Sequence, residues 1–335
     1  MAIDEGRPQL ARRGFLAGAG GALVAGLTAC ASGGARSGNG PPSPGFPVQI
    51  PNKHGTAEIP TAPERVVTLG TTDHDAALAL GVVPVGLNRW GPWDSGVGPW
   101  SEPLLRGQRP EQFTSDPDPE AVIRLAPDVV TAVQSALTAN RYAKLDRFAP
   151  VVAQPPETID YGVEWRQQVE ILGRALGKSE EAARVIEGTR ARIDRARRDN
   201  PSLQGRTHVT VQTSSSGEYA AYTKQDPRTR LLEELGLPLS PAVEQLGGEQ
   251  FSTRISRERV SLLDADVVIV TTPKSTDVEA ARADPLLNDL PAAKRGGLLL
   301  LDDYDLTMAL GSATATSIPY VIDELVPQLA AALRR

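Results

Sequence analysis

Short valine-rich runs alternate with helical patterns along the first half of the chain. The apolar runs are ERVVTLG, VVPVGL, PDVVTAV and APVVAQ, at residues 64–70, 82–87, 127–133 and 149–154. Between them, DHDAALAL (73–80), DPEAVIRL (118–125) and NRYAKLDRF (140–148) carry apolar residues at helical spacing. Strand and helix signals in alternation predict a parallel sheet with helices on both faces.

The second half repeats this plan. Its predicted strands are RTHVTVQT (206–213), DVVIVTT (266–272) and GLLLLDD (297–303), and its predicted helices are PRTRLLEELG (227–236), SRERVSLLDA (256–265) and TSIPYVIDELVPQLAAAL (316–333). Between the halves, residues 179–200 predict one long, strongly charged helix that starts at Ser179 and stops at Asn200-Pro201. A helix with so few apolar residues is typical of one that bridges domains. We therefore expect an α/β protein of two lobes with parallel-sheet cores, residues 48–178 and 201–335, joined by this helix.

The N-terminus has the pattern of an export signal. Arg12 and Arg13 precede an apolar run from Phe15 to Ala29, which is too short to span a bilayer as a mature helix. RRGFL resembles a twin-arginine motif, and LTAC at the end of the run matches a lipobox, which predicts lipidation of Cys30. We expect residues 1–29 to be a signal peptide and the Gly, Ser and Pro-rich residues 30–47 to be a flexible tether. The protein would then be extracytoplasmic, anchored by lipid to the outer face of the cell membrane.

The composition argues against several classes of site and partner. Cys30 is the single cysteine, so the chain can form no intrachain disulfide and no thiolate metal cluster. Loss of the signal would remove three arginines and two acids, which changes the net charge from −6 to about −7. Since no basic stripe is present, we expect no nucleic-acid partner.

Six phrases in order resemble a known family. They are GTAEIPTAPERVVTLG, LALGVVPVGL, DPEAVIRLAPDVV, LDRFAPVV, LGRALGKSEEAARVI and ISRERVSLLDADVVIV. From residue 48 to 333 the chain resembles the periplasmic binding proteins that serve iron-siderophore, haem and cobalamin ABC importers. The resemblance implies two α/β lobes, a connecting helix, a ligand cleft between the lobes, and no catalysis. It implies a monomeric receptor without an intrinsic cofactor that captures a ferric siderophore and delivers it to an ABC permease; a haem or cobalamin receptor is the alternative.

Candidate ligand contacts gather where predicted strands end. In open parallel sheets, ligands bind beyond the carboxyl ends of the strands. The loop NRWGPWDSGVGPW (88–100) follows the second strand and contains three of the four tryptophans, whose flat faces could stack on a ligand or simply pack the loop onto its lobe. Two arginines beside it could bind an anionic catecholate or carboxylate siderophore. The first-half candidates are Thr72, His74, Arg89, Trp90, Trp93, Trp100 and Arg106, and the second-half candidates are Tyr219, Tyr222, Arg228 and Tyr304.

The histidines and the DHD motif allow other interpretations. His54, His74 and His208 are too scattered to predict a zinc site, although His74 with a second-half tyrosine could ligate haem iron. Asp73, His74 and Asp75 could be imagined as the base of a secreted hydrolase. No G-x-S-x-G elbow, P-loop or G-x-G-x-x-G accompanies them, so helix capping explains the acids better.

Two glutamates complete the candidate residues. Glu120 in DPEAVIRL and Glu258 in SRERVSLL occupy similar positions near the start of a predicted helix, one in each half. The resemblance implies that such a pair docks onto arginine pockets of the permease. A glutamate in the first turn of a helix is also favoured by the helix dipole alone.

Overall fold

The computed structural model describes residues 44–114, 117–213, 218–272 and 275–334. The first element along the described chain is a β-hairpin. Strands β1 (Val48–Asn52) and β2 (Gly55–Ile59) pair antiparallel, with Asn52 opposite Gly55 across a two-residue turn. Alternate side chains on the hairpin, Ile50, Ala57 and Ile59, are buried in the largest apolar core. The hairpin therefore covers one side of the first half rather than extending its main sheet.

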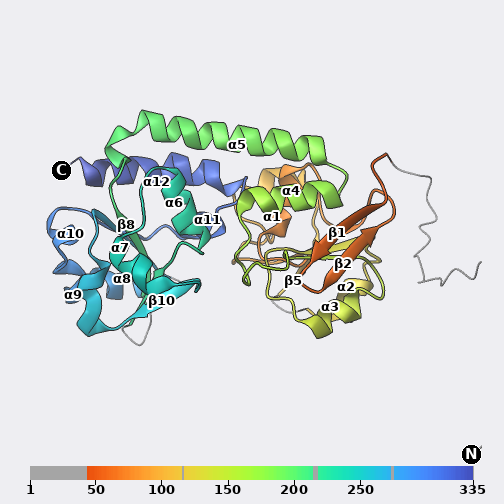
Figure 1. Ribbon diagram of the computed structural model, residues 1–335, viewed down its shortest axis with the longest axis horizontal. Coiled ribbons are helices and arrows are strands. Elements are labelled where there is room, and N and C mark those ends of the chain that lie inside the picture. The colour runs from red at the N-terminus through yellow and green to blue at the C-terminus, as the bar shows by residue number, and fades with distance from the viewer. Residues whose placement is uncertain (1–43, 115–116, 214–217, 273–274, 335) are drawn as a thin grey trace, which may run out of the picture. The chain divides into compact units, whose positions relative to one another are not determined.

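The first half is built on a parallel five-stranded sheet (Figure 1). Its strand order is β5-β4-β3-β6-β7, and the strands are β3 (Val66–Thr68), β4 (Gly86–Asn88), β5 (Glu111–Phe113), β6 (Val129–Ala132) and β7 (Val151–Ala153). The helices are α1 (Asp73–Ala79), α2 (Pro119–Ile123), α3 (Ala139–Leu145) and α4 (Trp165–Ala175), with a 3₁₀ helix at Glu102–Leu105. Separate apolar clusters cover the two faces of the sheet, which explains why its strands read as continuous valine-rich runs.

The second half has a mixed five-stranded sheet of order β10-β9-β8-β11-β12. β8 (His208–Thr213), β11 (Val267–Thr271) and β12 (Leu298–Leu301) are parallel, whereas β9 (Tyr219–Tyr222) and β10 (Ser252–Ile255) add an antiparallel edge. The surrounding helices are α6 (Pro227–Glu234), α7 (Pro241–Gly247), α8 (Ser275–Arg282), α9 (Pro285–Asn288), α10 (Pro291–Lys294), α11 (Tyr304–Ser312) and α12 (Ser317–Leu333), with 3₁₀ helices at Pro201–Leu203 and Arg257–Leu263.

Helix α5 (Ser179–Asp199) follows α4 and leads into the second half. It packs against α4 on one side of this connection and against α6 and α12 on the other, and it runs beside α12 in Figure 1. Arg192 of α5 and Asp323 of α12 form an ion pair with an N–O distance of 2.6 Å. One apolar cluster includes residues of α4, α5 and α12, so the connecting helix shares a core with both halves.

The predicted α/β class with parallel-sheet cores is confirmed. The antiparallel edge formed by β9 and β10 was not predicted from the sequence. The predicted strand at 82–87 is realised as β4 at Gly86–Asn88, and the predicted helix at 256–265 contains a 3₁₀ helix. The predicted signal peptide, Cys30 and most of the predicted tether lie outside the described residues.

Candidate functional site

The site begins at the carboxyl ends of β3 and β6, where a buried carboxylate ties two loops together. Asp73 accepts hydrogen bonds from the backbone nitrogens of Val133 (2.8 Å) and Gln134 (3.0 Å), and from Nε2 of Gln168 (2.9 Å). Gly70 passes so close that a Cβ there would lie 2.3 Å from the Asp73 carboxylate. These contacts fix the loop that carries Thr72.

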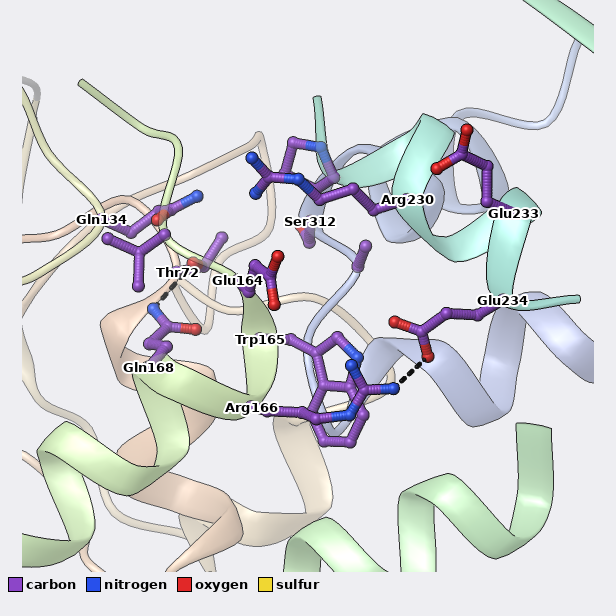
Figure 2. Close-up of a pocket in the computed structure, with 13 residues that line it drawn as sticks. Thr72, Gln134, Glu164, Trp165, Arg166, Gln168, Arg230, Glu233, Glu234 and Ser312 are labelled. Atoms are coloured by element: carbon purple, nitrogen blue, oxygen red, sulfur yellow. Dashed lines mark hydrogen bonds and ion pairs between the residues drawn. The ribbon is translucent and has the colours of Figure 1, made fainter. Parts of the chain in front are cut away.

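A cavity of about 330 Å³ opens beside this loop (Figure 2). Residues of both halves line it. The lining residues are Thr72, Gln134, Val163, Glu164, Trp165, Arg166 and Gln168 from the first half, and Pro227, Arg230, Glu233, Glu234, Ser312 and Ala313 from the second. Gln168 donates from Nε2 to the Thr72 hydroxyl at 3.1 Å, so two of the polar lining groups hold each other in place.

One wall of the pocket is an ion pair between α4 and α6. An Nη2–Oε2 distance of 2.7 Å joins Arg166 to Glu234, as the dashed line in Figure 2 shows. The Arg166 guanidinium also lies 4.9 Å from the centre of the Trp165 ring, within range of a cation–π interaction. Burial raises the pKa of Glu234, and the nearby Arg166 charge opposes that shift. The pair therefore connects the two halves at the edge of the pocket.

Arg230 is the second guanidinium of the pocket. It donates to the backbone oxygen of Gly162 at 2.7 Å, to that of Lys224 at 3.0 Å and to Oε1 of Gln225 at 3.0 Å. Burial lowers the pKa of Arg230, while the charge of Glu164 acts in the opposite direction. Because Gly162 belongs to the first half, Arg230 forms another bridge between the halves.

The tryptophan loop contacts the second half at a different place. Trp93 donates from Nε1 to Oδ1 of Asp305 at 2.9 Å, and its ring lies 6.0 Å from that of Tyr304 and 5.3 Å from that of Trp100. Trp100 donates to Oδ2 of Asp75 at 2.9 Å. These side chains do not line the pocket described above. Instead they hold the loop against the start of α11.

None of the three predicted arginines lines the pocket. Arg89 is exposed and donates to the carbonyls of Gly91 (2.8 Å) and Pro92 (2.7 Å). Arg106 is exposed at the end of a 3₁₀ helix, with a left-handed φ of 52°. Arg228 pairs with the buried Asp226 at 2.7 Å, and its guanidinium lies 4.1 Å from the centre of the Tyr222 ring.

The remaining aromatic candidates are largely held by protein contacts. Tyr219 is 1% exposed, and its hydroxyl donates to Asp284 at 2.5 Å. The Tyr222 hydroxyl donates to Oε1 of Gln212 at 2.6 Å. Trp90 is half-buried, and its Nε1 has no hydrogen-bond partner among the described residues. Of the predicted ligand contacts, Thr72 is the one that lines this pocket, and a role in binding stays a prediction for all of them, Thr72 included.

The histidines lie apart from the pocket. His74 is 3% exposed, with Nε2 3.6 Å from Oδ1 of Asp75, and burial lowers its pKa. His208 is fully buried in β8, and His54 lies in the turn between β1 and β2. Within the described ranges, no group of three or more His, Cys, Asp or Glu side chains is placed to hold a metal ion.

Both candidate docking glutamates are exposed. Glu120 lies in the first turn of α2, where its backbone nitrogen donates to the Asp118 cap at 3.1 Å. Glu258 lies in the 3₁₀ helix at Arg257–Leu263, and hydrogen bonds from its own backbone and from Ser256 lower its pKa. Neither residue lines the pocket, so charge changes at these sites leave its lining intact.

Most of the residues that line the pocket were not predicted from the sequence. Trp165 and Arg166 begin α4, whereas Arg230 and Glu234 lie in the middle and at the end of α6. The approach of these two helices depends on tertiary packing. A usable signal was nevertheless present. Trp165 is the fourth tryptophan and opens the first helix after β7, so the rule that placed the other three at strand ends applies to it as well.

In the part of the chain that the structure describes, none of the helices has the length and apolar character needed to cross a membrane. The predicted signal lies outside these residues.

Comparisons with known proteins agree with this architecture. Residues 66–304 match the model of the family described as periplasmic binding protein. The probable siderophore-binding lipoprotein YfiY of Bacillus subtilis (strain 168) is 26% identical over 287 residues, which cover 81% of this chain and 84% of YfiY.

Two solved structures are similar over most of their length. A periplasmic solute binding protein from Mycobacterium smegmatis str. MC2 155 has 31% identity and a TM-score of 0.77, covering 85% of this chain and 98% of that one. The iron uptake protein PiaA from Streptococcus pneumoniae TIGR4, in complex with ferrichrome, has 30% identity and a TM-score of 0.74, with the same coverage.

These relatives are binding proteins and not enzymes, which confirms the prediction of a binding protein over a secreted hydrolase. The family match covers more than half of the sequence, and the two-sheet architecture agrees with it. This chain belongs to the periplasmic binding protein family.

Proposed function

We propose that this protein is a receptor that binds a ferric siderophore in the pocket beside Trp165 and delivers it to the permease of an ABC importer. The observation that carries the proposal is a pocket lined by both halves of a periplasmic binding protein. Two relatives support the choice of ligand, since YfiY is named a probable siderophore-binding lipoprotein and PiaA is solved with ferrichrome.

The pocket offers the contacts that such a chelate needs. Trp165 supplies an aromatic surface, while Thr72, Gln134 and Ser312 supply polar groups for ligand oxygens. The cavity of about 330 Å³ is at the lower end of the usual range for small-molecule pockets. Binding would form and break no covalent bond, and iron would arrive inside the chelate.

No observation supports the alternative that the protein is a haem receptor. His74, the residue that could ligate haem iron, is buried beside Asp75 and does not line the pocket. The siderophore proposal therefore takes precedence over the haem alternative.

We also propose that Cys30 carries a lipid that anchors the protein to the outer face of the cell membrane. The support is the LTAC sequence after an apolar run and the description of YfiY as a lipoprotein. Cys30→Ala should leave the protein uncleaved or released from the membrane fraction. Normal processing and retention of that variant would refute the anchor.

We propose further that Glu120 and Glu258 dock onto the permease, one from each half. Their exposure and their distance from the pocket lining support this role. A working complex would thus bring together the receptor as a monomer, its ferric siderophore and the permease.

The ligand assignment is tested by titrating the protein with ferric siderophores while tryptophan fluorescence is followed. Trp165→Leu should weaken binding by roughly 1–3 kcal/mol, because it removes an aromatic contact but keeps an apolar side chain in the core. Phe148→Leu, at an aromatic residue that is 60% exposed and outside the pocket, is the matched control. Equal affinities of the two variants and the unmodified protein would refute binding beside Trp165.

A further inference from the structure

The pocket contains more acidic than basic side chains. Three glutamates, Glu164, Glu233 and Glu234, and two arginines, Arg166 and Arg230, line it among the described residues. With every group ionised, these side chains leave one net negative charge. A site for an anionic ligand normally shows the opposite balance.

Both guanidinium groups already have oxygen partners in the protein. Arg166 is 2.7 Å from a carboxylate oxygen of Glu234, which neutralises its charge locally. Arg230 donates from Nε, Nη1 and Nη2 to three protein oxygens at 2.7 to 3.0 Å. An anionic chelate would therefore have to compete with these protein oxygens for the charge of each arginine, which reduces the gain from the new contact.

Glu164 lies in the pocket without a capping role. It is the N-cap residue of α4, yet its side chain accepts no capping hydrogen bond, and it remains exposed to solvent. Figure 2 shows it between Arg230 and Trp165. A negative ligand bound against Trp165 would meet this carboxylate at short range.

From these contacts we infer that the pocket selects ferric chelates without net negative charge, the hydroxamate class, over catecholate and carboxylate chelates. The inference rests on the proposed function and names its substrate class. Three hydroxamates neutralise ferric iron, whereas three catecholates leave the complex an anion. The two arginines that suggested an anionic ligand from the sequence, Arg89 and Arg106, do not line this pocket.

The test varies ligand charge on one iron core. Ferrioxamine B has a free amine and is a cation, its N-acetyl derivative is neutral, and its N-succinyl derivative is an anion. We expect affinity to fall in that order, with the anion binding roughly tenfold or more weakly than the cation because of like-charge repulsion. Ferrichrome and ferric enterobactin are titrated alongside as a neutral hydroxamate chelate and an anionic catecholate chelate.

Variants then assign the effect to the pocket. Glu164→Gln should reduce the difference between the cationic and anionic derivatives, while Glu170→Gln, an exposed position on the same helix outside the pocket, should leave it unchanged. Equal or reversed affinities in the unmodified protein, or tighter binding of ferric enterobactin than of ferrichrome, would overturn the charge inference and leave the siderophore function standing. If none of these chelates binds, the proposed function fails as well.

Discussion

His208 shows how one buried side chain can make stability depend on pH. It is fully buried in β8, and neither ring nitrogen has a hydrogen-bond partner among the described residues. Burial lowers its pKa from 6.5 to about 3. The folded protein therefore keeps this imidazole neutral at pH values where the unfolded chain would protonate it.

The sign of the effect follows from proton linkage. Between pH 6.5 and about 3 the unfolded state binds the extra proton, so stability falls as the pH falls, by up to about 1.4 kcal/mol per pH unit. Above pH 6.5 the group contributes no pH dependence. The unmodified protein should therefore lose about 2 kcal/mol of unfolding free energy through this histidine between about pH 7.5 and about pH 5, and His208→Leu should not. Urea unfolding at both pH values measures the difference in unfolding free energy between the variant and the unmodified protein. A difference that is the same at both pH values would contradict this role.

At the scale of elements, the tryptophan loop and α11 form a contact that crosses between the halves. Trp93 and Asp305 are joined by the 2.9 Å hydrogen bond, and Trp93 also packs against Tyr304 and Trp100. A loop rich in glycine and proline has few backbone hydrogen bonds of its own, so such side-chain contacts stabilise it.

A double-mutant cycle measures that contact. Trp93→Phe and Asp305→Ala should each destabilise the protein, with a coupling free energy of about 1 kcal/mol, because each removes the same hydrogen bond. Trp90→Phe is the matched control, since the Trp90 Nε1 has no hydrogen-bond partner among the described residues. Chemical denaturation gives the four free energies, and strictly additive losses would show that the bond contributes nothing.

The sequence pattern predicted the buried parallel strands better than the exposed or short ones. The runs around Val66, Val129 and Val267 are continuous because both sheet faces are covered. β9 and β10, with sequences YAAY and STRI, are short and lie at one edge, so they carry no comparable signal. In VVPVGL, Pro84 cannot donate to a strand ladder, which fits the start of β4 at Gly86.

The site was less predictable because it depends on which helices approach each other. The sequence placed Thr72 and the tryptophan loop at strand ends, and the structure has them there. Whether a tryptophan then faces a pocket or a neighbouring helix is decided by contacts such as that of Trp93 with Asp305, more than two hundred residues away. Trp165 reaches the pocket for the same reason, through the approach of α4 to α6.

At the scale of the whole molecule, ligand binding and permease docking should be separable. Glu120→Arg combined with Glu258→Arg should leave solution affinity almost unchanged, because neither residue lines the pocket, yet abolish uptake by reversing charge at the permease. Glu187→Arg with Glu324→Arg, two other exposed positions, makes the same charge change as a control. Uptake assays at matched protein abundance decide the matter, and normal uptake by the first double variant would reject docking through this pair.

Native mass spectrometry shows directly whether the protein binds a ferric siderophore. The purified protein is offered an equimolar mixture of ferric siderophores, haem and cobalamin, and the bound species is identified by its mass. We expect a complex of one chain with one ferric siderophore, and loss of that complex in Trp165→Leu. A haem or cobalamin complex, or no complex with any member of the mixture, would contradict it.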